Sequence, residues 1–82
     1  MNTIKLLFFA TLRDRVGTNT TDLAIPDGLT VSGLKSLLTE RYPSAAPTLD
    51  TAIVAVNKEF AFDTDIIPAG AEIAIFPPVS GG

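Results

Sequence analysis

The chain has 82 residues and a formal net charge of −3, with 46% hydrophobic and 18% charged residues, a composition typical of one folded domain rather than a disordered chain. It contains no cysteine and no histidine, so disulfides, thiolate nucleophiles and imidazole bases are excluded. The acidic balance and the scattered basic residues argue against nucleic acid as a partner, and no apolar run approaches the ~18 residues that a membrane span needs.

The N-terminal part of the chain predicts two strands joined by a short helical turn. Residues 4–10 form an apolar run with one charged residue, Lys5, which is typical of a strand. A helical turn is predicted at residues 11–16, ending at Gly17, and a second strand at residues 20–25. No signal-peptide pattern precedes the first strand, so we expect a cytoplasmic protein.

One longer helix follows these strands. Thr30 is a suitable N-cap, and residues 31–41 show helical spacing of apolar side chains. The predicted apolar stripe contains Leu34, Leu37 and Leu38. Pro43 prevents the helix from continuing, and we expect a loop at residues 44–50.

Three short strands complete the chain, at residues 53–56, 60–62 and 72–76, with turns at residues 57–58 and 67–70 between them. Two strands, one helix and three strands predict an α+β fold, in which a mixed sheet carries one main helix on one face. No further element of the sequence is available to cover the other face.

Alternation within the first and last strands indicates which residues point to the bare face. Charged Lys5 points outward and takes Phe9 with it, while charged Glu72 points outward and takes Phe76 with it. A cluster of exposed apolar side chains marks a partner site. We therefore predict a partner interface that contains Phe9 and Phe76.

The end of the chain carries the candidate reactive group. We expect residues 77–82 to be a flexible tail on a single domain of residues 1–82, because two prolines remove ladder donors and two glycines have little conformational preference. Extended, such a tail reaches ~20 Å. An end without side chains fits a narrow channel of another protein, and its carboxylate can be converted to a reactive acyl adenylate. The carrier segment is Pro77, Pro78, Val79, Ser80 and Gly81, and the candidate group is the carboxylate of Gly82.

Three segments resemble a known family: L-F-F-A-T-L-R-D-R-V-G at residues 7–17, A-V-N at residues 55–57 and I-F-P-P-V-S-G-G at residues 75–82. The chain is similar in length and element order to the small subunits of molybdopterin synthase, which are ubiquitin-like sulfur carriers of the β-grasp fold. The tail is the most specific part of the resemblance.

The resemblance implies a mechanism. An E1-like enzyme would adenylate Gly82 with ATP and magnesium, and a sulfur-transfer protein would convert the adenylate to a thiocarboxylate. The tail would then enter the large subunit of a heterotetrameric synthase, where its sulfur attacks cyclic pyranopterin monophosphate and forms the dithiolene of molybdopterin. The catalytic groups would belong to the large subunit, so we expect this chain to bind no cofactor or metal and not to be catalytic alone.

The resemblance also extends the predicted interface. The β-grasp fold would place the first and last strands side by side and parallel, so that Phe9 and Phe76 lie together at the root of the tail. The resemblance adds Phe60 to this interface and suggests Arg13 as a polar contact at its rim. Asp63 and Asp65 are the nearest thing to a metal site in the sequence, but two carboxylates are too few ligands.

Three alternatives use the same features. The first is a protein modifier, in which Gly82 would be joined to a lysine amine. The second is the thiazole sulfur carrier of thiamin synthesis, which usually lacks the Phe-Pro-Pro sequence before its tail. The third alternative is a non-catalytic interaction domain whose tail has no role. The sequence does not indicate the sulfur source.

Overall fold

The computed structural model describes residues 1–78, so Val79, Ser80, Gly81 and Gly82 lie outside the described residues. The elements in chain order are β1 (Asn2–Phe8), α1 (Ala10–Val16), β2 (Thr20–Ile25), α2 (Val31–Arg41), the 3₁₀ turn η1 (Pro43–Ala45), α3 (Ala46–Asp50), β3 (Ile53–Val56), β4 (Glu59–Ala61) and β5 (Glu72–Phe76). None of the helices within residues 1–78 is long and apolar enough to cross a membrane.

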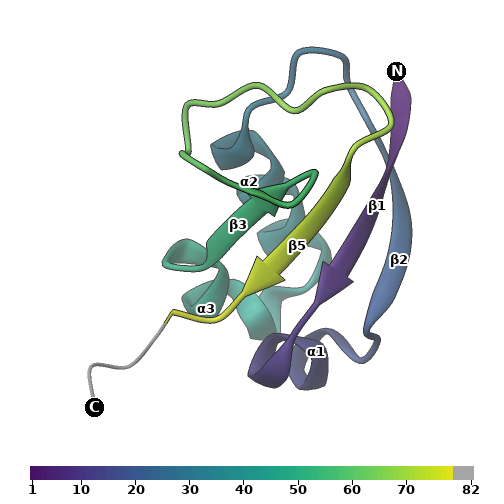
Figure 1. The fold of residues 1–82 in the computed structure, drawn as a ribbon. Coiled ribbons are helices and arrows are strands. Elements are labelled where there is room, and N and C mark those ends of the chain that lie inside the picture. The colour runs from purple at the N-terminus through teal and green to yellow at the C-terminus, as the bar shows by residue number, and fades with distance from the viewer. Residues whose placement is uncertain (79–82) are drawn as a thin grey trace.

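The five strands form one mixed sheet in the order β2-β1-β5-β3-β4. The central strands β1 and β5 are parallel, and the other neighbours are antiparallel. The arrowheads of β1 and β5 therefore point to the same end of the sheet, where the chain leaves β5 (Figure 1). The α+β fold class and the mixed sheet predicted from the sequence are confirmed.

The helices α2 and α3 lie against one face of the sheet, which we call the inner face (Figure 1). Alternate residues of the strands point to it and are buried, as the predicted alternation requires. The core contributed by β1, β5 and α2 consists of Ile4, Leu6, Phe8, Ile73, Ile75, Val31, Leu34 and Leu38. Leu37 was predicted to join the apolar stripe of α2 but is 36% exposed. At 100° per residue, it lies about a quarter turn away from the line through its buried neighbours.

The start of α2 is capped as predicted. The hydroxyl oxygen of Thr30 accepts a hydrogen bond of 3.1 Å from the backbone N–H of Gly33. The N–H groups of Val31 and Ser32 have no acceptor within the helix. They donate instead to the carbonyls of Asp65 and Asp63, at 3.0 and 2.9 Å respectively. The loop after β4 is thereby fixed to the N-terminus of α2.

The loop predicted at residues 44–50 is wrong, because the structure has η1 and α3 there. Pro43 and Pro47 each lie in the first turn of their helix, where the fixed φ of proline suits the helix and its missing N–H is not needed. Ala45 and Leu49 are fully buried. Proline acted here as a helix start rather than only as a stop, and burial of two apolar side chains stabilises these short turns.

Two strands also differ from the prediction at both ends. The first strand was expected at residues 4–10 but runs from Asn2 to Phe8, since the chain turns at Ala10 (φ 53°) into α1. The strand expected at residues 60–62 runs from Glu59 to Ala61. Asn57 and Lys58, with φ of 50° and 73°, form a two-residue hairpin turn that makes Glu59 the first residue of β4.

Candidate partner interface at the root of the tail

The aromatic rings of Phe9 and Phe76 stack on each other where the chain leaves β5. Their centroids are 4.6 Å apart and their planes differ by 13°, a geometry that stabilises by about 0.5–1.5 kcal/mol beyond area burial. Phe9 remains 40% exposed, and Phe76 is half-buried. We call these two residues the tail-root pair, because Pro77 follows directly. The alternation predicted that both rings point to the uncovered face, the family resemblance implied that they lie together, and the structure places them so.

The backbone holds Phe9 in position from both sides. Its N–H donates to the carbonyl of Ile75 at 3.2 Å, and its carbonyl accepts from the N–H of Leu12 at 3.1 Å. Phe9 keeps an extended conformation (φ −120°, ψ 152°) although β1 ends one residue earlier. The ring is therefore presented on the uncovered face of the sheet by the junction of β1 and α1.

Next to this pair, the uncovered face of the sheet, which we call the outer face, carries small side chains. Leu7 lies opposite Ala74, and Ala74 lies opposite Ala55. Ala55 in turn lies opposite Phe60 on the edge strand β4. Ala55 is 8% exposed although it shares this face with Ala74. The outer face thus has a floor of small side chains between the tail-root pair and Phe60.

The two ends of the outer face differ in charge. At the end away from the tail, Lys5 lies opposite Glu72 on one side and Asp22 on the other. At the end where the tail leaves, the outward residues are the aromatic tail-root pair. Apolar surface is therefore concentrated where a partner that takes the tail would make contact.

Arg13 lies on α1 beside the tail-root pair. Its side chain is 56% exposed, and its Nε lies 3.8 Å from a carboxylate oxygen of Asp14, a pair too open to hold it firmly. Together with Lys5, Leu7 and Phe9 it lines a shallow hollow of about 310 Å³. The structure thus brings Arg13 to the rim where a polar contact was predicted, and the contact itself stays a prediction.

Phe60 shares the outer face but is separate from the tail-root pair. It is 81% exposed and lies on β4, with β3 between it and β5. The sequence reasoning missed two further exposed residues, Ile53 opposite Phe76 and Phe62 just after β4, with exposures of 37% and 79%. The two-residue turn at residues 57–58 fixes the register of this hairpin, and alternation along it was the signal that could have found Ile53.

The acidic pair after β4 has structural partners. Asp63 Oδ1 lies 3.0 Å from Lys35 Nζ, and a carboxylate oxygen of Asp65 accepts from the N–H of Phe62 at 2.7 Å. Within residues 1–78 there is no group of three or more acidic side chains that could hold a metal ion.

Comparison with known proteins gives a consistent result. Residues 6–82 match the model of a family described as the ThiS family. A molybdopterin synthase sulfur carrier subunit of Dictyostelium discoideum is 39% identical over 84 residues, which cover 99% of this chain and 98% of that protein. The function predicted from the sequence agrees with the name of this relative.

Solved structures show the same fold. The small archaeal modifier protein 1 of H. volcanii superposes with a TM-score of 0.85 at 25% identity, over 96% of this chain and all (100%) of that one. A complex of subunits 1 and 2 of the molybdopterin-converting factor from Helicobacter pylori contains a chain with a TM-score of 0.67 at 17% identity, over 98% of this chain and 99% of that one. The ubiquitin-like β-grasp fold expected from the sequence is confirmed.

Proposed function

This chain belongs to the ThiS family, and we propose that it is the sulfur carrier subunit of a molybdopterin synthase, with the carboxyl group of Gly82 as its working group. One observation carries the proposal: the tail-root pair lies at the point where the chain leaves the sheet toward the sequence Pro-Pro-Val-Ser-Gly-Gly. A partner that binds the aromatic pair is positioned to receive the end of the chain.

The proposed cycle has three steps. An E1-like enzyme uses ATP and magnesium to convert the carboxylate of Gly82 to an acyl adenylate, with release of pyrophosphate. A sulfur-transfer protein then supplies the sulfur that replaces AMP, which leaves a thiocarboxylate. In the large subunit this sulfur attacks cyclic pyranopterin monophosphate, and water then cleaves the bond between the acyl carbon of Gly82 and the sulfur, which returns Gly82 to a carboxylate. Two such deliveries complete the dithiolene. We place the protein in the cytoplasm, where ATP is available to the activating enzyme.

The residues of this chain serve the cycle by position rather than by acid–base chemistry. The sheet fixes Phe76, and the stacked ring of Phe9 supports it. Pro77 and Pro78 follow directly and have no N–H to continue the ladder of β5. Arg13 is proposed to contact the partner at the rim. The large subunit is proposed as the partner in a heterotetramer, which is supported by the complex of two such subunits in the Helicobacter pylori structure.

A protein modifier is the second candidate, because the similar archaeal structure bears the name of a modifier. Both candidates use the same activation of Gly82, and they differ in the acceptor of the acyl group. Mass spectrometry of cell extracts distinguishes them, by searching for lysines that carry the remnant that trypsin leaves of this chain, residues 59–82, since Lys58 is the last basic residue of the sequence. Abundant remnants that disappear when Gly82 is deleted would favour the modifier.

A titration tests the first candidate against the thiazole sulfur carrier. Purified chain is titrated in parallel with the large subunit of molybdopterin synthase and with thiazole synthase. We expect binding to the former at least about 100-fold tighter than to the latter, which corresponds to about 2.7 kcal/mol. Equal or reversed affinities would contradict the proposed partner. Phe76→Ala serves as a control, since it should reduce whichever binding uses the tail-root pair.

A further inference from the structure

The strand β2 forms one edge of the sheet and pairs only with β1 (Figure 1). The N–H of Phe8 donates to the carbonyl of Asn19 at 2.9 Å, one step beyond the first register pair of the two strands. In an antiparallel strand the backbone groups of successive residues face opposite sides. Counting from Asn19, every second residue therefore faces β1. The N–H and carbonyl groups of Thr20, Asp22 and Ala24 face away from the sheet.

Both ends of this free edge are closed. The hydroxyl group of Thr18 donates to the carbonyl of Thr20 at 2.9 Å and accepts from the N–H of Thr20 at 3.4 Å, so it occupies both outward groups of that residue. At the other end β2 is followed by Pro26, which has no N–H to donate. The outward groups that stay available to a further strand are those of Asp22 and Ala24.

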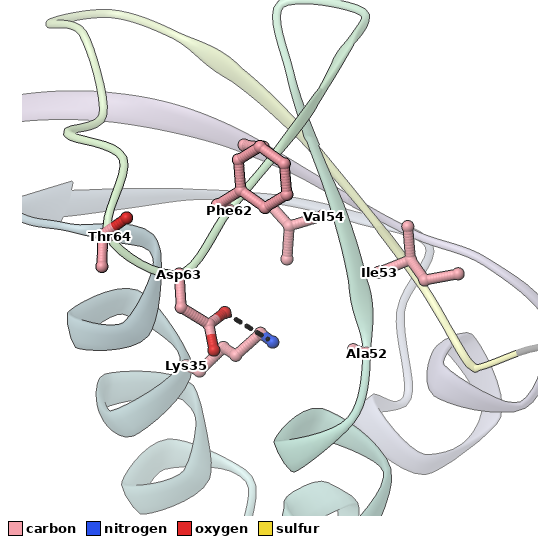
Figure 2. A pocket seen from close by; sticks show the side chains of 8 residues that line it. Lys35, Ala52, Ile53, Val54, Phe62, Asp63 and Thr64 are labelled. Atoms are coloured by element: carbon pink, nitrogen blue, oxygen red, sulfur yellow. Dashed lines mark ion pairs between the residues drawn. The ribbon is translucent and has the colours of Figure 1, made fainter.

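The other edge of the sheet, on β4, is closed by the loop that follows this strand. The N–H of Phe62 donates to the carboxylate of Asp65 at 2.7 Å, and its carbonyl accepts from the N–H of Asp65 at 3.0 Å. The same loop is fixed to α2 by the ion pair of Asp63 and Lys35, whose Oδ1 and Nζ lie 3.0 Å apart (Figure 2). One outward residue, Phe60, remains between this closure and the hairpin turn. The longer free edge is therefore that of β2.

The available length of β2 matches a second copy of itself. A two-fold axis at Leu23 places Asp22 of one copy opposite Ala24 of the other, and such a pair exchanges two backbone hydrogen bonds. The next outward pair along this register would join Thr20 to Pro26. The ladder ends before that pair, because the hydroxyl of Thr18 occupies Thr20 and Pro26 lacks a donor. The two symmetry-related pairs of Asp22 and Ala24 thus form the whole ladder.

The inner-face side chains of this edge are apolar where the two copies would meet. Leu23 is half-buried and Leu37 of α2 is 36% exposed, and both line a hollow of about 390 Å³ between β2 and α2. Leu23 would contact its own copy at the axis, beside this hollow. The other side chains of the rim include Glu40 and Arg41, whose charges cancel. Apolar surface would therefore be covered without bringing two like-charged rims together.

The charges on the outer face are also compatible with this pairing. Asp22 would lie opposite Ala24 of the copy rather than opposite a second carboxylate, and Lys5 is its cross-strand neighbour within the chain. Like charges that lie directly opposite each other would destabilise a strand pair. The tail-root pair lies on β5 and at the end of β1, not on the edge of β2, so the pairing leaves it accessible.

We propose that two copies of this chain associate through the free edge of β2, around a two-fold axis at Leu23, and form one continuous sheet. The contact is small, so the association is weak, with a dissociation constant of roughly 0.1–1 mM. The inference does not rest on the proposed function, because neither the tail-root pair nor Gly82 takes part in it.

Sedimentation equilibrium of the full chain tests the inference. We expect the average mass to rise from that of one chain toward that of two as the concentration increases from roughly 0.05 to 2 mM. Ala24→Pro removes an outward N–H that bonds nothing within residues 1–78, so the chain should fold normally. It should weaken association at least about tenfold, because half of the ladder loses its donors. Ala24→Ser keeps the N–H and is the matched control, with association within about twofold of the unchanged chain.

Amide hydrogen exchange of the unchanged chain tests the register without any variant. The N–H groups of Asp22 and Ala24 should exchange about two- to fivefold more slowly at the highest concentration than in dilute solution. The N–H groups of Thr20 and of Phe60 on the other edge should exchange at the same rate throughout.

Three results would overturn the inference. The first is a chain that stays monomeric at the highest concentration. The second is association that folded Ala24→Pro leaves unchanged or that Ala24→Ser weakens equally. The third is slower exchange at Phe60 instead of Asp22 and Ala24, which would assign the contact to β4. The proposed function stands in each case, since it is decided by the titration with the large subunit.

Discussion

The inner and outer faces of the sheet are built from the same strands, yet the apolar residues of the two faces have different roles. Along β5, Ile73 and Ile75 point inward and are fully buried, whereas Ala74 and Phe76 point outward and stay partly exposed. Neighbouring residues in one strand therefore contribute to different equilibria. The inner residues stabilise the fold, and the outer residues are available to a partner.

The largest effect on folding is expected from the inner face. Ile73→Ala should lower the free energy of unfolding by ~2–5 kcal/mol, because it leaves a cavity in the central strand of the sheet. Ile53→Ala removes the same atoms from the outer face, where Ile53 is 37% exposed, and should cost less than about 1.5 kcal/mol. Chemical denaturation measures both. Equal losses would mean that the two faces are not distinct.

The largest effect on binding is expected from the outer face. Phe76→Ala should weaken binding to the large subunit by ~2–4 kcal/mol, or about 30- to 1,000-fold. It also removes the stacked pair with Phe9 and should lower stability by about 1–2 kcal/mol. A binding titration and a denaturation curve on one preparation decide between the two equilibria.

Phe60→Ala serves as the comparison for stability alone, because Phe60 is 81% exposed and its truncation should change the free energy of unfolding by less than about 0.5 kcal/mol. The distinction between the faces would be broken if Phe76→Ala unfolded readily while its folded fraction bound the large subunit normally.

A smaller effect is expected at the rim of the outer face. Arg13→Ala should slow association with the large subunit several-fold at low salt, and the difference should shrink as salt screens the charge. Arg15→Ala is the matched control, since Arg15 lies on the same helix and contacts the carbonyl of Ser44 at 3.4 Å. Stopped-flow association rates at two salt concentrations measure this, and equal slowing by both variants would remove Arg13 from the interface.

The smallest effect is expected at a group that belongs to neither face. The side-chain hydrogen bond from Asn2 at 2.8 Å holds the pKa of Asp27 below its ordinary value of 3.8. A lowered folded-state pKa stabilises the fold above the ordinary value, and the contribution is lost as the pH falls through the lowered value. Asp27→Asn should therefore melt slightly earlier than the unchanged chain at neutral pH, and the two melting temperatures should converge in acid. Partner binding should not change.

Much of this organisation could be predicted from local patterns. Alternation around Lys5 and Glu72 gave the direction of Phe9 and Phe76, and Thr30 marked the start of α2. The parallel pairing of β1 and β5, on which the tail-root pair depends, came from the family resemblance, because strand order involves contacts that are distant in sequence.

The remaining features depend on tertiary context. Residues 44–50 read as a loop because Pro43 prevents the preceding helix from continuing, and only the burial of Leu49 makes a helical turn favourable there. The path of the loop after β4 could not be predicted either. The carbonyls of Asp63 and Asp65 accept hydrogen bonds from the N–H groups of Ser32 and Val31 at the start of α2, and these contacts join residues that are distant in sequence.

The central claim is that the carboxyl group of Gly82 is the working group. Intact mass measurement after incubation with the activating enzyme, ATP, magnesium and a sulfur donor tests it most directly. We expect the full chain to exchange one oxygen for one sulfur, with fragmentation placing the change at the last residue. A chain without Gly82 should gain no sulfur and should keep its melting temperature, since the buried core runs from Ile4 to Ile75. If sulfur is found elsewhere in the chain, or if the shortened chain gains sulfur as readily as the full chain, the account is contradicted.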